Sequence, residues 1–464
     1  MHRYLPLNFR WLFVIAALSF LPALFHYYVG EEAIFPISSL EMWQHGEWLK
    51  QYLYGSDLQH NPLFNWLIMP LSALAGWQHV QVVTRALTIC ATLATGLTLA
   101  WLVQRLFRDR AFAAFAALAY LTMLDVLLYH GWLCYVDPLF AMFVFASVAA
   151  LWVAAHEQRN ALLATAGILL SCAFLSKAFT AYLFYGTAAL VLLFDSKQRI
   201  FLLRRPALLI HAATLAAPLA WFVFLPGGHG QSGRMFDEIL HKLALVDAGD
   251  YLGRLATYPL EILLWLSPIT LLAAYYWLRR RNIREDEEDR RLFRTACWIA
   301  LLQFLPYWFS PQGGMRYLLP VYPLLALAAA RIVWQSGENA LTVARNWMVG
   351  ALALNCVLAL VVFPYYQSHY RGKNYDETAA DIIMLTQGQP LYSKDVSAVG
   401  LSVTAYLDQR RYPAPAVQMP PAEWKNGFVL SLTEDAALGE VHKKYRLGGD
   451  ELYLLCRGEA CRKT

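Results

Sequence analysis

A few ionisable side chains interrupt the long apolar segments of this chain. Two carboxylates, Glu31 and Glu32, follow the first apolar segment, and Asp137 lies within a later one. Lys177 and Arg316 interrupt or open two further segments. An ionisable group in hydrocarbon costs roughly 3 kcal/mol or more, so such residues are interpreted first as functional. A carboxylate can take a proton from a hydroxyl group, and a lysine or arginine can hold an anion such as phosphate.

The composition is that of an integral membrane protein. Hydrophobic residues make up 58% of the chain and charged residues 15%, whereas soluble proteins carry about 25% charged residues. Apolar runs of about 18 residues or more recur through the first 365 positions, which predicts an all-α polytopic protein with about eleven transmembrane helices. Nothing in the sequence indicates nucleic-acid binding. The predicted spans are residues 11–28, 80–104, 111–128, 133–154, 160–176, 178–195, 206–226, 257–278, 292–310, 316–333 and 346–364.

The distribution of Lys and Arg predicts the orientation of these spans. Basic residues gather on alternate connections, and by the positive-inside rule these connections and the N-terminus are cytoplasmic. We therefore expect the membrane domain to be residues 1–365 and an external, periplasmic domain to be residues 366–464. The charged motifs then collect at the periplasmic face of a bacterial inner membrane. Lys177 would stand at a tight outer turn between two spans.

Two long outer loops are expected, at residues 29–79 and 227–256. The first is rich in Trp and Tyr, and its segments 37–53 and 62–77 predict helices lying on the membrane surface. The second opens with four glycines in the seven residues from Gly227 to Gly233. That segment is either a lid or a flexible connection, and the sequence favours neither.

The tail after residue 365 has mixed charge and short apolar runs. Residues 376–385 and 396–407 predict helices, and residues 427–432 and 451–455 predict strands, so a small α/β domain is expected. Its two cysteines, Cys456 and Cys461, can form a disulfide in an oxidising compartment or remain free thiols. No Cys/His cluster has the spacing of a zinc site, so no metal ligands are assigned. No cofactor is predicted, and a divalent metal is possible but not indicated.

Several motifs share an order along the chain and a predicted side of the membrane. A carboxylate pair follows the first span, a proline-containing motif follows in the first outer loop, and a membrane Asp precedes a proline. A Lys lies in a short Leu-Ser-Lys-Ala motif, and an Arg opens an Arg-Tyr-Leu-Leu-Pro motif. These motifs are Glu31–Ala33, Glu41–Trp43, Gly46–Trp48, His60–Leu67, Arg85–Leu87, Val136–Leu139, Leu175–Ala178 and Arg316–Pro320.

Over about residues 10–335, this set resembles the C-type glycosyltransferase superfamily, in its branch of aminoarabinose (lipid A) transferases and protein O-mannosyltransferases. The resemblance implies a sugar donor carried on a polyprenyl (undecaprenyl) phosphate and a lipid or glycolipid acceptor. Three departures from the family pattern stand out. Glu31 replaces the family Asp, so either carboxylate of the pair can be the base. His60 replaces a Lys, and Ala178 replaces a Gly.

The resemblance and the residue chemistry together assign candidate roles. A carboxylate activates the acceptor hydroxyl, cations hold the donor phosphate, and neighbouring aromatic residues contact substrate. The lipid tail is expected in a groove between spans. The candidates are Glu31, Asp137 and Glu32 for catalysis; Lys177, Arg316, Arg85, His60 and Arg234 for donor phosphate; and Tyr317, Trp43 and Tyr135 for substrate.

Other interpretations of these residues stay open. The glutamates can cap a span at the interface, and Asp137 can be a hydrogen-bonding group between helices. Lys177 and Arg316 can extend to the lipid head groups, and Arg234 is better explained as a solvated loop charge. For the whole chain, the alternatives are a protein O-glycosyltransferase, a flippase for lipid-linked sugars and a non-catalytic glycolipid-binding subunit.

Overall fold

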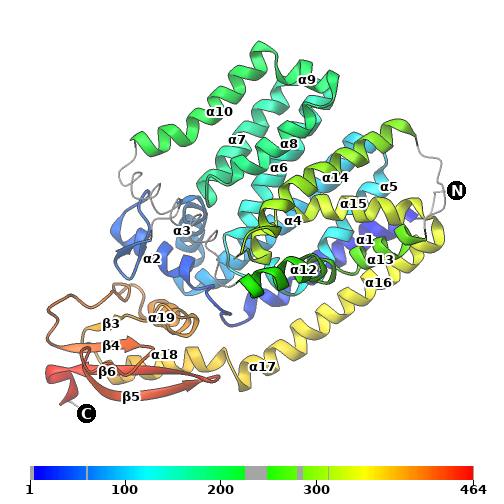
Figure 1. The fold of residues 1–464 in the computed structure, drawn as a ribbon. Helices are drawn as coiled ribbons and strands as arrows, with labels where there is room; N and C mark the ends of the chain where they lie inside the picture. The colour runs from blue at the N-terminus through cyan, green and yellow to red at the C-terminus, as the bar shows by residue number, and fades with distance from the viewer. Residues whose placement is uncertain (1–4, 59–60, 225–247, 280–285, 312, 463–464) are drawn as a thin grey trace. The chain divides into compact units, whose positions relative to one another are not determined.

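The computed structural model describes residues 5–58, 61–224, 248–279, 286–311 and 313–462 (Figure 1). His60 and Arg234, two predicted phosphate ligands, lie outside the described residues, as does most of the glycine-rich loop. The chain divides into two compact units, which are described separately. Unit 1 comprises residues 1–21, 88–132 and 136–356, and unit 2 comprises residues 22–87, 133–135 and 357–464. This is a different partition from the predicted boundary at residue 365, which remains a prediction.

Unit 1 is a helical bundle. Helices α6, α7 and α8 lie side by side, and α10 runs along α7 (Figure 1). The helices are α1 (Leu5–Leu18), α4 (Val80–Phe107, in unit 1 from residue 88), α5 (Arg110–Leu121), the π-helix η3 (Val126–His130), α6 (Asp137–Glu157), α7 (Asn160–Ser176), α8 (Ala181–Leu192), α9 (Ser196–Leu202), α10 (Arg205–Phe224), α12 (Ala248–Trp265), α13 (Ile269–Leu278), α14 (Glu287–Trp308), the 3₁₀ helix η4 (Met315–Leu318), α15 (Tyr322–Gln335) and α16 (Glu338–Val357).

Several helices in the described part of the chain have the length and composition of membrane spans. Four qualify singly: Trp77–Phe107, Asp137–Glu157, Arg205–Phe224 and Glu338–His369. Shorter apolar helices include Asn160–Ser176 and Ala181–Leu192. The fold is therefore mainly helical and suited to a membrane, as predicted. The count of eleven spans and the orientation remain predictions.

The predicted spans at 160–176 and 178–195 are separated where the sequence indicated. Helix α7 ends at Ser176 and α8 begins at Ala181, so Lys177 lies in the connection between them. The predicted span at 257–278 is broken, because α12 and α13 meet at a bend of 108°. Pro268 is the N-cap of α13, and its ring cannot continue the preceding helix.

Unit 2 combines the segments around the first outer loop with the C-terminal segment. Its elements are η1 (Leu21–Phe25, in unit 2 from residue 22), α2 (Ile34–His45), β1 (Tyr52–Leu53), β2 (Ser56–Asp57), α3 (Leu63–Ala75), η2 (Trp77–His79), the first turns of α4, the π-helix η5 (Leu358–Val362), α17 (Phe363–His369), α18 (Lys373–Thr386), β3 (Leu391–Ser393), α19 (Ala398–Arg411), β4 (Gly427–Ser431), β5 (Glu440–Leu447), β6 (Asp450–Arg457) and η6 (Gly458–Cys461).

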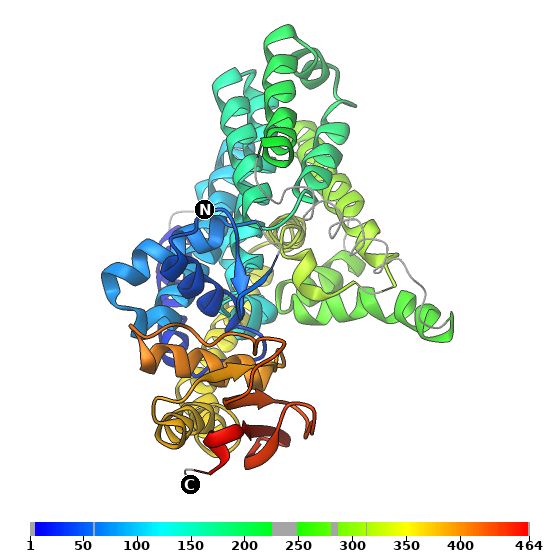
Figure 2. The same ribbon diagram turned by 90° about the vertical axis from the view of Figure 1, so that its left-hand side faces the viewer.

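The strands β3 to β6 form one mixed sheet, seen from two sides in Figures 1 and 2. The strand order is β3-β4-β6-β5, with β3 parallel to β4 and the other pairs antiparallel. Side chains alternate along β4: Phe428 and Leu430 belong to the core that includes α18 and α19, whereas Val429 packs with Trp424. This two-residue period is what one sheet with both faces covered requires. Cys456 and Cys461 form a disulfide at its end.

Of the elements predicted for unit 2, those in the tail are confirmed and one in the first outer loop is not. The helices and strands expected in the tail are present, and β3 and β5 are added to them. In the first outer loop, the helix expected over 37–53 ends at His45, so that boundary was wrong. Gly46 adopts the left-handed conformation that ends α2, and the strands β1 and β2 follow.

Candidate functional site

Asp137 and Lys177 form an ion pair at the ends of two adjacent helices in unit 1. The Lys177 ammonium donates a hydrogen bond to the Asp137 carboxylate. Asp137 is the first residue of α6, with Pro138 next to it, and Lys177 is the C-cap of α7. A negative charge at a helix N-terminus and a positive charge at a C-terminus are both favoured by the helix dipole. The pair is only partly closed, because the Lys177 side chain keeps 23% of its surface exposed.

Aromatic rings surround the ammonium group of Lys177. Its Nζ atom lies 4.7 Å from the ring centre of Tyr317 and 5.8 Å from that of Phe140. The Arg316 guanidinium lies 5.2 Å from the same Tyr317 ring and donates to its hydroxyl at 3.3 Å. Two cations therefore share one tyrosine, each within cation–π distance. The helix η4 thus brings Arg316 and Tyr317 to the Asp137–Lys177 pair.

Glu32 and Arg85 form a second ion pair, in unit 2, and it is closed. Both side chains have no exposed surface, and two guanidinium nitrogens donate to the carboxylate at 2.7 and 3.1 Å. The Glu32 carboxylate also accepts from the backbone N–H groups of Val29 and Cys134, both at 2.7 Å. These four bonds occupy both carboxylate oxygens.

The remaining donors of Arg85 are equally occupied. Its guanidinium donates to the backbone carbonyls of Ala23 and Tyr27 at 2.9 Å, and also to that of His26. Arg85 thereby ties the segment that follows the first helix to the start of α4. The contacts are those of a structural ion pair, although Arg85 and Glu32 were predicted to contact substrate.

Glu31 differs from its neighbour in being exposed. It follows Gly30, whose φ of +60° is in the left-handed region. A Cβ atom on Gly30 would lie 3.0 Å from the Tyr135 hydroxyl, so a side chain there would be strained and crowded. Tyr135 is therefore placed beside the carboxylate pair in unit 2, where the sequence predicted a substrate contact.

The predicted site residues fall into two groups. Asp137, Lys177, Arg316 and Tyr317 come together in unit 1, and a second group comes together in unit 2. The second group is Glu31, Glu32, Arg85, Tyr135 and Trp43. Within unit 2, Trp43 is 38% exposed and packs against Trp77, with ring centres 6.1 Å apart. The common cavity predicted for Glu31 and Asp137 joins residues of both units and remains a prediction.

Two further carboxyl groups of unit 2, those of Glu41 and Asp408, are buried, and neither forms a salt bridge with another described residue. Glu41 accepts from the backbone N–H groups of Tyr54 and Gly55 at 2.7 and 2.8 Å, and burial raises its pKa in spite of these bonds. Burial raises the pKa of Asp408 to about 8, while a hydrogen bond from the Val417 N–H acts in the opposite direction. Glu41 thereby links α2 to the β1–β2 turn, and Asp408 links α19 to the segment at Val417. No motif in the sequence points to Asp408.

A polar cavity of about 610 Å³ lies in unit 1 between α12 and the segment 313–315. Arg254 and Tyr258 line it, and neither was predicted as a site residue. Their spacing of four residues, continued by Asp250 and Glu261 on the same helix, was the available signal. This spacing was missed because the prediction assigned the first part of α12 to the outer loop 227–256 and the rest to the span 257–278.

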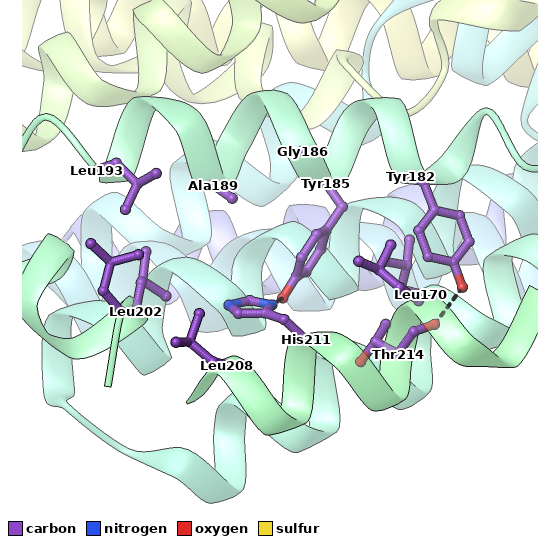
Figure 3. A pocket seen from close by; sticks show the side chains of 12 residues that line it. Leu170, Tyr182, Tyr185, Gly186, Ala189, Leu193, Leu202, Leu208, His211 and Thr214 are labelled. Atoms are coloured by element: carbon purple, nitrogen blue, oxygen red, sulfur yellow. Dashed lines mark hydrogen bonds between the residues drawn. The ribbon is translucent and has the colours of Figure 1, made fainter. Parts of the chain in front are cut away.

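An apolar cavity of about 270 Å³ lies between α7, α8 and α10 (Figure 3). Leucines form much of its wall, and two tyrosines are held by hydrogen bonds. Tyr182 donates to the Thr214 carbonyl at 3.0 Å, and the Tyr185 hydroxyl lies 3.3 Å from His211 Nδ1. Leu170 in this wall precedes Lys177 by about two turns of α7. Such a cavity suits a hydrocarbon chain rather than a sugar.

No group of three or more His, Cys, Asp or Glu side chains that could hold a metal ion occurs within the described ranges.

The chain is similar to known glycosyltransferases. Residues 59–223 match the family model described as dolichyl-phosphate-mannose-protein mannosyltransferase. The undecaprenyl phosphate-alpha-4-amino-4-deoxy-L-arabinose arabinosyl transferase of Pectobacterium carotovorum subsp. carotovorum is 26% identical over 377 residues, which are 77% of this chain and 62% of that protein. The enzyme of the same name from Pseudomonas aeruginosa is 26% identical over 439 residues, or 89% of this chain and 75% of that one.

The chain spans 62% and 57% of the length of the two Pectobacterium relatives that it matches. Among solved structures, ArnT from Cupriavidus metallidurans bound to undecaprenyl phosphate superposes with a TM-score of 0.67 at 16% identity, covering 98% of each chain. Its apo state gives 0.69.

The fold is thus similar to that of these ArnT structures. More closely, the chain resembles the C-type glycosyltransferase superfamily in its aminoarabinose transferase-like branch, as the sequence motifs predicted.

Proposed function

We propose that this chain is an integral-membrane glycosyltransferase that uses a sugar donor carried on undecaprenyl phosphate. It transfers the sugar to a lipid or glycolipid acceptor at the periplasmic face of a bacterial inner membrane. The relatives named above support the donor, and 4-amino-4-deoxy-L-arabinose is the first sugar to test. Lipid A is the first acceptor to test.

The observation that carries this proposal is the open Asp137–Lys177 pair with Arg316 and Tyr317 beside it. Lys177 and Arg316 supply two cations within one cluster, and such a cluster suits a phosphate group. Asp137 lies in the same cluster and supplies a carboxylate. A leaving phosphate gains negative charge as its bond to the sugar breaks, so fixed cations stabilise the transition state more than the bound donor.

In the proposed reaction, a carboxylate takes the proton of the acceptor hydroxyl. The hydroxyl oxygen attacks the anomeric carbon, the bond from that carbon to the phosphate oxygen breaks, and undecaprenyl phosphate leaves with the bonding electrons. Attack opposite the leaving group inverts the anomeric centre. Glu31 is the proposed base because it is exposed, with Asp137 sharing the role or orienting the acceptor. Glu32 remains a weaker candidate for the base.

The same proposal assigns His60, Arg234 and Arg85 to the donor phosphate as secondary candidates. Arg85 is the weakest of these on contacts, because carbonyl groups and Glu32 occupy its guanidinium. Trp43 and Tyr135 are proposed to contact substrate from unit 2.

The direct test is a transfer assay with the purified chain in detergent. The protein is incubated with undecaprenyl phosphate carrying 4-amino-4-deoxy-L-arabinose and with lipid A, and the products are analysed by mass spectrometry. The expected product is lipid A heavier by one sugar residue. Mass spectrometry of glycolipids from cells with and without the gene identifies the acceptor if lipid A is inert. Absence of any gene-dependent glycolipid would count against a lipid acceptor.

A protein acceptor is the second candidate, because the matched family model is described as a protein mannosyltransferase. Glycoproteomics of periplasmic proteins from cells with and without the gene tests for a protein acceptor. Gene-dependent hexose on Ser or Thr, with unchanged glycolipids, would favour the protein acceptor.

A further inference from the structure

Helix α12 carries a stripe of polar residues along one face. Asp250, Arg254, Tyr258 and Glu261 follow one another at intervals of four, four and three residues, so they share a face of the helix. Leucines on the same helix, such as Leu252 at 66% exposure, are directed outward. A polar stripe on a largely apolar helix needs polar partners.

The stripe lines a cavity, although the Tyr258 ring also packs against α14. All four residues line the cavity of about 610 Å³ whose opposite wall is Gly313, Gly314 and Met315. Arg316 follows this wall directly in the sequence. The cavity therefore adjoins the segment that carries one of the two proposed phosphate-binding cations, within the same unit.

Two buried polar atoms in the cavity wall have no hydrogen-bond partner among the described residues. They are the hydroxyl oxygen of Tyr258 and Nε of Arg254. Tyr258 is only 2% exposed. Leaving a buried hydroxyl unpaired is unfavourable, and a ligand that supplies the partner would explain why it is retained here.

The positions of these atoms are fixed by packing. The Tyr258 ring stacks on Phe304 with ring centres 6.0 Å apart and planes at 3°, and the Arg254 guanidinium lies 4.9 Å from the Tyr258 ring centre. Arg254 also donates to the Gly313 carbonyl. A Cβ atom on Gly313 would lie 2.8 Å from the Tyr307 carbonyl oxygen, so glycine allows this close approach. The donors are therefore preorganised.

The charges of the cavity favour a hydroxyl-rich ligand over an isolated phosphate. One guanidinium and two exposed carboxylates, Asp250 and Glu261, sum to a formal charge of −1. Carboxylates accept hydrogen bonds from hydroxyl or amino groups, while the guanidinium and the tyrosine donate to hydroxyl oxygens. An aromatic ring, a donor pair and acceptor carboxylates in one cavity match the two-sided hydrogen bonding of a sugar ring.

We propose that this cavity binds the hydroxyl groups of a sugar ring, and that Tyr258 and Arg254 hold the ring. The proposal rests on the glycosyltransferase function above and extends it to residues outside the predicted site. The sugar belongs either to the lipid-linked donor or to the glycolipid acceptor, and the chemistry is the same for both.

The test compares Tyr258→Phe with Tyr275→Phe, a control on α13 whose tyrosine is 45% exposed and does not line the cavity. Binding to the purified full chain in detergent is measured with three probes: undecaprenyl phosphate alone, undecaprenyl phosphate carrying 4-amino-4-deoxy-L-arabinose, and lipid A. Thermal unfolding without ligand is measured in parallel. Tyr258→Phe removes an oxygen that has no hydrogen-bond partner in the described part of the chain, so its unliganded unfolding temperature should equal or exceed that of the wild type.

Tyr258→Phe is expected to weaken binding of one sugar-bearing probe by about three- to tenfold, as loss of one hydrogen bond implies. Binding of undecaprenyl phosphate alone and the behaviour of Tyr275→Phe should not change. A loss confined to the sugar-bearing donor assigns the cavity to the donor sugar, and a loss confined to lipid A assigns it to the acceptor.

Unchanged affinity for both sugar-bearing probes overturns the inference while leaving the proposed function intact. Failure of the wild type to bind undecaprenyl phosphate or its sugar-bearing form counts instead against the proposed function. Arg254→Lys supplies the second variant: it keeps the charge but lacks the Nε donor, and it should affect the same probe as Tyr258→Phe.

Discussion

Two carboxylate–cation pairs, one in each unit, show how different the same chemical pairing can be. The Glu32–Arg85 pair has no exposed surface, and protein groups occupy its carboxylate and its guanidinium. In the Asp137–Lys177 pair, the lysine is 23% exposed and rings rather than carbonyls surround its ammonium. We infer that saturation of hydrogen bonds, not burial of charge alone, distinguishes a structural ion pair from one available to a substrate.

The strongest loss of activity should follow removal of the two proposed catalytic carboxylates, Asp137 of the open pair and Glu31 of unit 2. Asp137→Asn and Glu31→Gln should each lower the transfer rate by about 10²- to 10⁴-fold, because the amides keep the shape and lose the base. Donor binding and the unfolding temperature should stay close to wild type. Glu31→Asp should retain part of the activity. Steady-state transfer rates with saturating donor give the measurement, and full activity of Asp137→Asn would remove that residue from the site.

The closed pair should respond in the opposite way, through stability. Arg85→Met leaves the Glu32 carboxylate buried without its counter-charge, which costs about 3–5 kcal/mol. Thermal unfolding in detergent measures this loss, with Lys177→Met as the matched variant of the open pair. Lys177→Met should lower stability less, because water reaches its site and the helix dipole of α6 supports Asp137. Equal losses for the two variants would contradict the distinction between the pairs.

An intermediate effect is expected for the two cations around Tyr317. Lys177→Ala and Arg316→Ala should weaken donor binding by about ten- to a hundredfold, since each removes a charge-assisted contact worth roughly 1.5–3 kcal/mol. The readout is the KM for donor together with direct binding of undecaprenyl phosphate. Arg345→Ala, which removes a partly exposed arginine of α16, is the control. A normal KM for donor in both well-folded variants would show that Lys177 and Arg316 do not bind the donor phosphate.

A further effect, on the pH dependence of stability, concerns a buried carboxyl group outside both pairs. Burial raises the pKa of Asp408 to about 8, above its value of about 3.9 in an unfolded chain. Its contribution to stability is therefore full below pH 4 and is lost as the pH rises toward and through 8. Asp408→Asn should flatten this decline, so that the variant gains stability relative to wild type at pH 9 and not at pH 4. Unfolding temperatures at the two pH values provide the check.

The sequence predicted the helical character and the family resemblance because both rest on local patterns. Long apolar runs and short motifs can be seen in the chain without knowing its contacts. The pairing of Asp137 with Lys177, forty residues away, depends on how α6 packs on α7. Glu31 and Glu32 look equivalent in sequence, yet Arg85 and the Cys134 N–H, both distant in the chain, contact Glu32, which is buried, whereas Glu31 is exposed. Which of the two glutamates is buried therefore depends on tertiary packing, which no local sequence pattern encodes.

The bend between α12 and α13 shows a second limit. Hydropathy averages over about 19 residues, so it merged the start of α13 with the end of α12 and assigned the rest of α12 to a loop. The polar stripe containing Arg254 and Tyr258 was thereby divided. A search at helical spacing across the predicted boundary would have joined it.

The outer strand β5 has a consequence for self-association. It pairs only with β6 in its sheet, so its far side is an open row of backbone groups that another chain could extend. Lys443, Lys444 and Arg446 place three basic side chains along this strand, where Lys443 forms an ion pair with Asp381 and Lys444 with Glu451. The pairing register shifts between Val441 and Lys443. Long charged side chains at the edge and the local irregularity both oppose edge-to-edge growth into fibrils. The edge strand β5 therefore carries features that hinder pairing of this sheet with the sheet of another chain.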